Sequence, residues 1–237
     1  MPWQLLIKRL NLRKHCKMMS KTRIIAIDGY AATGKSTLAK KLAAALNFRY
    51  MDTGAMFRAL TYQAMAQGFL KDNRLNDTAF EAFLSKSHFY WEGSVLGFNQ
   101  QVLGNEIRTY EVSTNVSKIA ALPYVRKFTL KSQRDLAQGY SIVMDGRDIG
   151  TVVFPEAQHK FFLDASPEVR AQRRWKEMQQ QGSTISLEAV LENVRTRDQE
   201  DSSRTIAPLR KADDALLIDT SNQNIEEVFQ ILMSHLV

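Results

Sequence analysis

A glycine-rich loop with a lysine near its end constrains this sequence more than any other feature. Residues 29–37 read Gly-Tyr-Ala-Ala-Thr-Gly-Lys-Ser-Thr and match the phosphate-binding pattern G-x-x-x-x-G-K-[ST]. An apolar run at residues 22–28 precedes the loop, and the residues that follow at 35–46 are rich in Ala, Leu and Lys, which favour a helix. This strand–loop–helix unit predicts an α/β fold that holds the triphosphate of a nucleotide, which we take to be ATP.

The chemistry of phosphate binding accounts for the composition of the loop. Backbone N–H groups must converge on phosphate oxygens, so the side chains must be small, and the N-terminus of the following helix adds its positive dipole end. We expect Lys35 to neutralise the β- and γ-phosphates and the Ser36 hydroxyl to bind Mg²⁺. The predicted ATP site comprises Gly29, Tyr30, Ala31, Ala32, Thr33, Gly34, Lys35, Ser36 and Thr37.

Further apolar runs that end in aspartate indicate the rest of the sheet. They lie at residues 140–145, 159–164 and 215–219. Helical patterns fill the intervals, at residues 124–138, 167–181, 186–200 and 224–236. Alternating strands and helices predict a mostly parallel sheet with helices on both faces.

One stretch departs from this alternation. Residues 88–107 contain short aromatic and β-branched segments separated by Gly and Asn, a pattern that predicts a small antiparallel meander. Helical patterns at 55–67 and 76–87 precede it, so the whole region is predicted to be inserted into the α/β core.

The net charge of +7 is concentrated at one end of the chain. Residues 1–17 contain five basic residues and no acid, so the remainder carries little net charge and we expect no nucleic-acid partner. No apolar run reaches the roughly 18 residues that cross a bilayer, so we expect no membrane association. The single cysteine, Cys16, is typical of a reducing compartment, here the cytoplasm.

The basic N-terminal segment has two interpretations. It lacks a secretory cleavage site, but a leader without acids resembles an organelle transit peptide. We favour translation from Met18 or Met19, which makes residues 1–20 an extension that is disordered or not translated, ahead of a kinase domain over residues 21–237.

Three classes of P-loop protein have to be separated. A switch GTPase carries an Asn-Lys-x-Asp guanine reader, which is absent, and a motor ATPase or helicase is longer. The C-terminal half is instead rich in arginine, at Arg170, Arg173, Arg174, Arg195, Arg197 and Arg204. A small kinase needs several such cations because its transition state spreads charge over donor and acceptor oxygens. For Arg170 and Arg195, a solvated helix face is an equal alternative.

Longer motifs carry a more specific signal. They are Ile-Asp-Gly-Tyr-Ala-Ala-Thr-Gly-Lys-Ser-Thr at 27–37, Met-Asp-Thr-Gly-Ala-Met-Phe-Arg at 51–58, Ile-Arg-Thr at 107–109, Ser-Lys-Ile-Ala at 117–120, Asp-Gly-Arg-Asp-Ile-Gly-Thr-Val-Val-Phe-Pro at 145–155 and Ala-Pro-Leu at 207–209. With these motifs the sequence resembles the bacterial cytidylate kinases, within the nucleoside monophosphate kinase family, over residues 22–236. The resemblance implies a P-loop kinase core with an α+β monophosphate-binding insert at about 54–110 and a short lid at about 170–183.

The resemblance also implies a reaction, in which ATP phosphorylates CMP or dCMP by direct in-line transfer, and a role for each matching residue. Ser117, Arg126 and Asp148 match the positions that read cytosine, whose exocyclic amine suits a carboxylate. The other matching positions bind the acceptor sugar and phosphate, at Arg58, Arg147, Arg197, Asp201 and Arg204.

Catalysis in such a scheme requires no general base, because the acceptor is already an anionic phosphate oxygen. The expected catalytic groups are Lys35, Arg147, Arg204 and the lid arginines Arg173 and Arg174. With Ser36, Asp145 is expected to orient Mg²⁺ through water, although it is also a plausible capping carboxylate. We expect a monomer.

The sequence departs from the family pattern at several positions. Tyr30 stands where Pro is frequent, Phe57 replaces a Tyr, and Tyr110 stands where an acid is common. Two alternative functions remain open at this point. One is a related kinase with another acceptor, such as UMP or shikimate, and the other is a nucleic-acid-binding ATPase.

Overall fold

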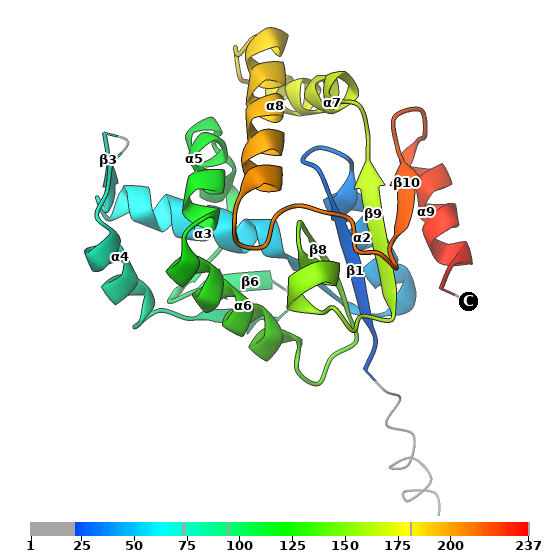
Figure 1. The fold of residues 1–237 in the computed structure, drawn as a ribbon, viewed down its shortest axis with the longest axis horizontal. Coiled ribbons are helices and arrows are strands. Elements are labelled where there is room, and N and C mark those ends of the chain that lie inside the picture. The colour runs from blue at the N-terminus through cyan, green and yellow to red at the C-terminus, as the bar shows by residue number, and fades with distance from the viewer. Residues whose placement is uncertain (1–21, 73, 94, 181, 237) are drawn as a thin grey trace, which may run out of the picture.

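A five-stranded parallel sheet forms the centre of the molecule in the computed structural model (Figure 1), which describes residues 22–72, 74–93, 95–180 and 182–236. The predicted N-terminal extension, residues 1–20, lies outside these ranges. The strand order is β10-β9-β1-β8-β2, and every pair is parallel. The strands are β1 (Ile24–Gly29), β2 (Arg49–Asp52), β8 (Ile142–Gly146), β9 (His159–Asp164) and β10 (Leu216–Asp219). The prediction of an α/β fold with a parallel sheet is confirmed.

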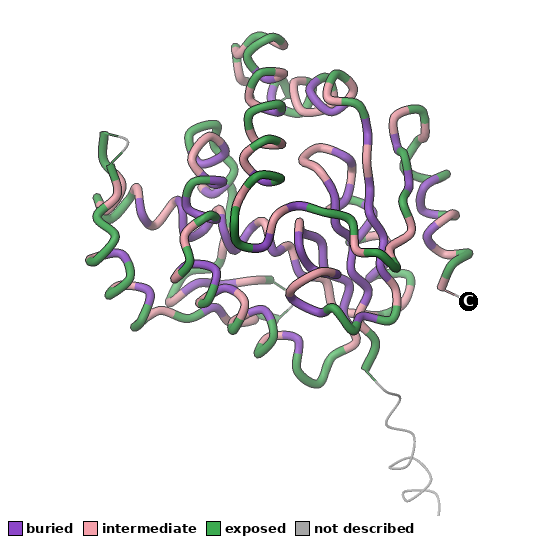
Figure 2. The backbone as a smooth tube through the Cα atoms, in the orientation of Figure 1, coloured by how far each residue is buried: buried purple, intermediate pink, exposed green. Residues whose placement is uncertain are grey.

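Helices cover both faces of the sheet, as a buried parallel sheet requires. Successive residues of β1 point to opposite faces: Ile25 and Ile27 pack with α2 and α9, while Ala26 packs with α3 and α6. Figure 2 shows the buried residues running along these strands and along the helix sides that face them. The helices around the sheet are α2 (Lys35–Leu46), α3 (Thr53–Ala66), α6 (Pro123–Ala137) and α9 (Ile225–Ser234).

The predicted insertion is present as a small α+β unit. Its three-stranded antiparallel sheet consists of β5 (Phe89–Glu92), β6 (Val95–Phe98) and β7 (Gln101–Val102). Phe89 and Phe98 face each other across this sheet, with ring centroids 4.8 Å apart. The hairpin of β3 (Leu70–Lys71) and β4 (Arg74–Leu75) and the helices α4 (Asp77–Leu84) and α5 (Tyr110–Ala120) complete the region.

Two helices form an arm beside the sheet. They are α7 (Pro167–Gln180) and α8 (Leu187–Ser203), which lie together above the sheet in Figure 1. Ala171, Met178, Val190 and Val194 form a separate apolar cluster between them. The Trp175 indole N–H donates to the backbone oxygen of Ile185 at 3.0 Å and fixes the turn between the helices. The arm therefore has its own small core.

Several elements were not predicted from the sequence, among them the hairpin of β3 and β4 and the three described next. Strand β2 has only four residues, with a polar side chain at either end, so its apolar signal is short. Helix α5 carries Thr109, whose hydroxyl caps it, but its interior is rich in Ser, Thr and Asn. The third element is a π-helical turn, η2 (Ile149–Val153), which has no reliable sequence signature.

None of the helices that the structure describes has the length and apolar character needed to cross a bilayer.

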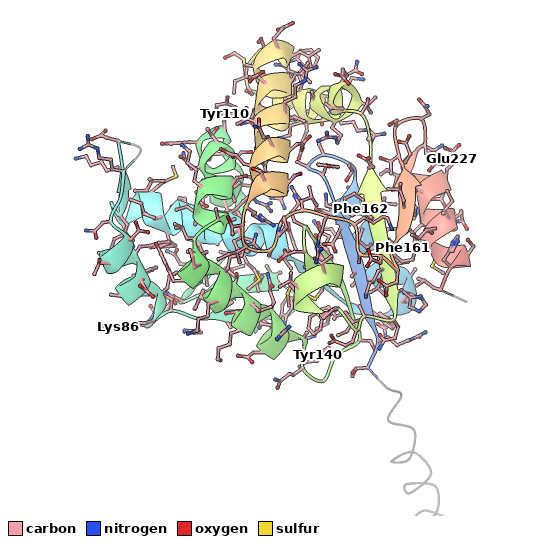
Figure 3. All side chains as sticks on the ribbon, viewed as in Figure 1. Lys86, Tyr110, Tyr140, Phe161, Phe162 and Glu227 are labelled. Atoms are coloured by element: carbon pink, nitrogen blue, oxygen red, sulfur yellow. The ribbon has the colours of Figure 1, made fainter. Side chains whose placement is uncertain are left out.

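Figure 3 labels aromatic side chains that differ in burial. Phe161 and Phe162 are neighbours on β9 and are both buried, whereas Tyr110 at the start of α5 is 41% exposed. Tyr110, which stands where the family commonly has an acid, is thus a surface position.

Candidate functional site

A cavity of about 320 Å³ opens at the carboxyl ends of β1, β8 and β2. Ligands bind at this edge of open parallel sheets because the loops that leave the strands converge there. The cavity is bounded by the P-loop, the start of α3, helices α5 and α6, and the arm. Predicted site residues that line it are Ala31, Ala32, Gly34, Lys35, Ser36, Thr37, Arg58, Ser117, Arg126, Asp145, Arg147, Asp148, Arg174, Arg197, Asp201 and Arg204.

The P-loop conformation depends on its glycines. Gly29 has φ +141°, and a Cβ at this position would lie 2.0 Å from the backbone oxygen of Leu163 on β9. Gly34 has φ +89° and directly precedes α2, so the loop enters the helix through the left-handed region. Only glycine satisfies both requirements at position 29, the close approach and the positive φ.

Lys35 is folded back onto the loop. Its ammonium group donates to the backbone oxygen of Tyr30 and, at 3.3 Å, to the hydroxyl of Thr33. The side chain is buried, and burial together with the charge of Arg147 lowers the pKa of its amine well below the usual value. Both of these acceptors are neutral, so a phosphate bound in this loop would give the amine an anionic partner.

Ser36 and Asp145 meet at the base of the cavity. The Ser36 hydroxyl donates to Asp145 Oδ2 at 2.8 Å, and the Tyr50 hydroxyl donates to Oδ1 at 2.8 Å. Burial first, and then the charge of Asp52, raises the pKa of the Asp145 carboxyl to about 6. This end of the cavity thus presents a hydroxyl and a carboxylate, the hard oxygen donors that Mg²⁺ prefers.

Asp201 organises the opposite side of the cavity. Its carboxylate accepts from the Ser117 hydroxyl at 3.2 Å, from Arg147 Nε at 2.9 Å and from Arg204 Nη1 at 3.5 Å. Burial opposes its ionisation, but Arg147, Arg197 and Arg204 together hold the pKa of the carboxyl below its usual value. Asp201 is therefore ionised and fixes two guanidinium groups at the cavity wall.

Arg126 and Asp148 form a second buried pair. Arg126 Nη1 donates to Asp148 Oδ2 at 2.7 Å, and both side chains are less than one-tenth exposed. Arg126 Nε donates to the backbone oxygen of Ala120 at 2.7 Å, and its guanidinium lies 4.8 Å from the centre of the Phe57 ring. Phe57, where a Tyr is usual, thus supplies a flat apolar surface for this arginine.

Several arginine N–H groups at the cavity have no partner among the described residues. They are Arg58 Nε, Arg197 Nε and Arg204 Nη2, and all three atoms are buried. Buried polar groups in native proteins are almost always paired, so orphaned donors beside a cavity indicate a missing ligand. Burial lowers the pKa of Arg197 and Arg204 to about 10, still well above neutrality, so both are cationic. The missing ligand is therefore an anion.

The structure separates the two predicted lid arginines. Arg173 does not line the cavity and donates to the hydroxyl and the backbone oxygen of Thr220, at 3.1 and 2.6 Å. Arg174 lines the cavity and pairs with Glu177 at 3.0 Å.

Arg170 and Arg195 also differ. The solvated-face alternative is wrong for Arg170, which is 2% exposed and binds Asp198 through two hydrogen bonds of 3.0 and 2.5 Å. Its guanidinium also lies 5.0 Å from the centre of the Tyr30 ring. Arg195 is exposed and pairs with Glu168 at 2.9 Å, as a solvated helix face predicts.

Four further residues at or near the cavity were not singled out from the sequence. Asp52 and Arg108 line the cavity, Tyr50 binds Asp145, and Asp28 is buried on β1 directly before the P-loop. Asp52 also accepts from Arg58 Nη2 at 2.8 Å. Asp28, Asp52 and Arg108 stand inside the motifs quoted above. Their position next to predicted site residues was therefore the sequence feature that could have identified them.

The comparisons with known proteins agree with one another. A family model described as "Cytidylate kinase" matches residues 25–236. A cytidylate kinase of Flavobacterium johnsoniae is 48% identical over 215 residues, which cover 88% of this chain and 94% of the relative. Cytidylate kinases of Clostridioides difficile and Nitratidesulfovibrio vulgaris are 44% and 42% identical, and the matches cover 89% and 90% of this chain and 96% and 92% of theirs.

Proposed function

The chain belongs to the cytidylate kinase family, and we propose on this basis that its cavity transfers the γ-phosphoryl group of ATP to CMP or dCMP. The observation that carries the proposal is the pairing of two anion sites in one cavity. The P-loop lies on one side, and the orphaned N–H groups of Arg58, Arg197 and Arg204 lie on the other. A phosphoryl transfer between two phosphates requires this arrangement.

On the donor side, the P-loop residues 29–37 hold the ATP phosphates. Lys35 neutralises the transferring group once a phosphate displaces its contacts to Tyr30 and Thr33. ATP enters as its Mg²⁺ complex, and the ion supplies charge neutralisation to the phosphates. Ser36 and Asp145 would hold it, Asp145 through water. The described residues contain no group of three or more His, Cys, Asp or Glu side chains suited to a metal, which fits an ion held mainly by phosphates.

On the acceptor side, arginines hold the monophosphate. Arg58, Arg147 and Arg204 bind its oxygens, Arg197 lies at the sugar and phosphate, and Asp201 accepts from the ribose hydroxyls. The fixed contacts of Arg147 and Arg204 to Asp201 keep these guanidinium groups in place before substrate arrives. Pre-ordered charges stabilise a transition state without reorganising during the reaction.

Cytosine recognition falls to Ser117, Arg126 and Asp148. The Asp148 carboxylate accepts from the exocyclic amine of cytosine, while Ser117 and Arg126 face the ring nitrogen and carbonyl acceptors. Uracil would place a carbonyl oxygen against the Asp148 carboxylate and leave both acceptors unpaired. The salt bridge from Arg126 to Asp148 supports this assignment, because it fixes the carboxylate at the cavity wall.

Closure of the site falls to two regions. We assign acceptor binding to the insert at about 54–110 and the lid function to residues of about 170–183, which fall mainly on α7. Arg174 is the lid arginine that meets the transferring phosphate, since it already lines the cavity and Arg173 does not. We also propose a monomer, because the large exposed hydrophobic residues are distributed over different helices, strands and loops. A cytoplasmic location and the lack of a nucleic-acid partner are proposed from the single cysteine and from the concentration of net charge in residues 1–17.

The test is a coupled ADP-release assay with CMP, dCMP, UMP, AMP and shikimate as acceptors. We expect CMP and dCMP to be preferred over UMP by at least about tenfold in kcat/KM, as expected where a site's polar groups are left unpaired. Asp148→Ala should raise the KM for CMP strongly and leave the KM for ATP nearly unchanged, because the side chain touches only the acceptor base. A preference for UMP, or equal loss of both affinities in the variant, would contradict the proposal.

A further inference from the structure

Asp28 is a buried carboxylate that none of the roles above uses. It is the penultimate residue of β1, immediately before Gly29 of the P-loop, and is 5% exposed. Its two oxygens accept hydrogen bonds from the backbone N–H groups of Ile149 and Gly150, at 2.8 and 2.7 Å. Both of the hydrogen bonds that the structure describes for this carboxylate therefore run to the segment after Asp148, and neither runs to the P-loop.

The segment that Asp28 holds is the π-helical turn η2. Val152 N–H and Val153 N–H both donate to the backbone oxygen of Asp148, which begins the turn. A turn of this kind is rare and is frequently found at functional sites. At its far end Arg134 of α6 donates to the backbone oxygens of Val152 and Val153, each at 3.0 Å. The turn is thus anchored at its start by Asp28 and at its end by Arg134.

The packing leaves the turn little freedom where Asp28 meets it. A Cβ on Gly150 would lie 3.4 Å from Asp28 Oδ2 and 3.1 Å from Lys160 Cδ, so the backbone of the turn lies close against both side chains. Removal of one hydrogen-bonding partner here would leave buried N–H groups without an acceptor, which is costly enough to shift the backbone. Asp148, one residue before the two N–H groups, would move with them.

We propose that Asp28 is a positioning residue for the acceptor base: it fixes the turn that presents Asp148 to cytosine, and so sets the preference for CMP over UMP. The inference rests on the proposed role of Asp148. A salt bridge of 2.7 Å between Arg126 and Asp148 leaves little tolerance for displacement, so a small shift of the turn disrupts base recognition. Although Asp28 adjoins the ATP loop in sequence, it acts on the acceptor.

The test compares Asp28→Asn and Arg134→Ala with Lys131→Ala. Asparagine keeps the shape of the side chain but turns an amide N–H group toward a backbone N–H group. Arg134→Ala removes the contact at the other end of the turn, and Arg134 itself is exposed. Lys131 lies on the same helix, is exposed and pairs only with Asp135 among the described residues, so it is the matched control. The readouts are kcat/KM for CMP and for UMP and the KM for ATP.

We expect the CMP-to-UMP ratio of kcat/KM to fall about tenfold in Asp28→Asn and by a smaller factor in Arg134→Ala, as when a buried polar contact of a specificity site is lost. The KM for ATP should stay within about twofold in both, and Lys131→Ala should match the unmodified protein. An unchanged ratio in both anchor variants, or an equal rise in the KM values for ATP and CMP, would overturn the inference. Should Asp28→Asn fail to fold, the ratio in Arg134→Ala decides.

A double substitution separates this inference from the proposed function. In an Asp148→Ala background, Asp28→Asn should have no further effect on the CMP-to-UMP ratio, because Asp28 acts through Asp148. If Asp148→Ala alone leaves the ratio unchanged, the assignment of the base reader fails. If Asp148→Ala lowers the ratio and Asp28→Asn does not, only the role of Asp28 fails.

Discussion

Lys35 shows at the scale of one residue how the protein prepares for an anion. The amine is buried, lies near the charge of Arg147 and, among the described residues, donates hydrogen bonds to the backbone oxygen of Tyr30 and the hydroxyl of Thr33. An ammonium group in such surroundings destabilises the folded protein until a phosphate arrives. The free enzyme is therefore less stable because of this charge, and binding of ATP removes the destabilisation.

Replacement of Lys35 by methionine tests this view. Methionine has a similar length without the charge, so the turnover number should fall by roughly a thousandfold or more, since the transferring phosphoryl group loses its cation. The melting temperature should stay the same or rise, because the buried charge is gone. Stopped assays and thermal unfolding of the same preparation give both values. An ordinary turnover number would contradict the donor-site assignment.

Asp28 leads to a prediction on pH and stability. Burial raises the pKa of its carboxyl to about 7, and the negative charge of Asp148 also raises it. The hydrogen bonds from the two N–H groups of the turn and the charge of Lys35 lower the pKa, but they do not offset burial. The folded pKa lies above the unfolded value of 3.8, so its contribution to stability is fully present below about pH 4 and is lost as the pH rises through about 7. Asparagine at this position does not titrate.

The measurement is the free energy of unfolding in urea at pH 5 and pH 8, for the unmodified protein and for Asp28→Asn. The difference between the two proteins should shift by roughly 2–3 kcal/mol between these pH values, with the unmodified protein relatively more stable at pH 5. Asp145, whose pKa is also raised, titrates in both proteins and cancels in the comparison. A difference that is constant with pH would show that Asp28 is ionised throughout this range.

At the scale of secondary-structure elements, the long periodic segments were predictable, whereas several short or polar elements were not. The helices at 35–46 and the strand at 159–164 match their predicted bounds, because an unbroken apolar pattern and a flanking glycine loop or aspartate mark them. Strand β2, helix α5 and the turn η2 gave no comparable signal. Their conformations depend on contacts from distant elements, such as the carboxylate of Asp28 on η2.

The candidate site shows the same division. Gly34, Lys35 and the arginines of the fixed motifs line the cavity, as expected from motifs in which the spacing of these residues follows from their chemistry. The distinction between Arg173 and Arg174 could not, since adjacent helical residues point in different directions and only the tertiary structure fixes which one faces the cavity. Likewise, the contact of Tyr30 with Arg170 involves residues that are far apart in the chain.

Arg170 and Arg195 provide a matched pair at this scale. Both are arginines of α7 or α8 that bind an acid on the other helix, but Arg170 is buried with Asp198 and Arg195 is exposed with Glu168. Arg170→Ala should lower the free energy of unfolding by about 3–5 kcal/mol, because Asp198 is left half-buried without its partner. Arg195→Ala should lower it by less than about 1 kcal/mol. Urea denaturation measures both, and equal effects would contradict the structural role assigned to Arg170.

At the scale of the whole molecule, the arrangement of rigid parts matters more than any single contact. The sheet carries the P-loop, helix α3 carries Arg58, and the arm carries Arg174 and Arg197 around one cavity. The arm packs around its own apolar cluster, and we therefore predict that it moves as a unit against the sheet. Water must be excluded during transfer, or ATP would be hydrolysed, and closure of such units achieves this.

This view predicts a measurable closure between the arm and the insert. Spin labels at Lys176→Cys on α7 and Lys86→Cys after α4, both exposed positions, report their separation in a Cys16→Ser background. The mean distance should shorten by several ångströms when CMP and a non-hydrolysable ATP analogue are both bound, and less with either alone, because both anions are needed to neutralise the arginines on the two sides. A second pair within the arm, at Lys176→Cys and Glu192→Cys, should keep its distance, since the apolar cluster between α7 and α8 holds the arm rigid. A change in this internal pair with no change in the first would place the motion inside the arm and contradict closure of the arm as a unit.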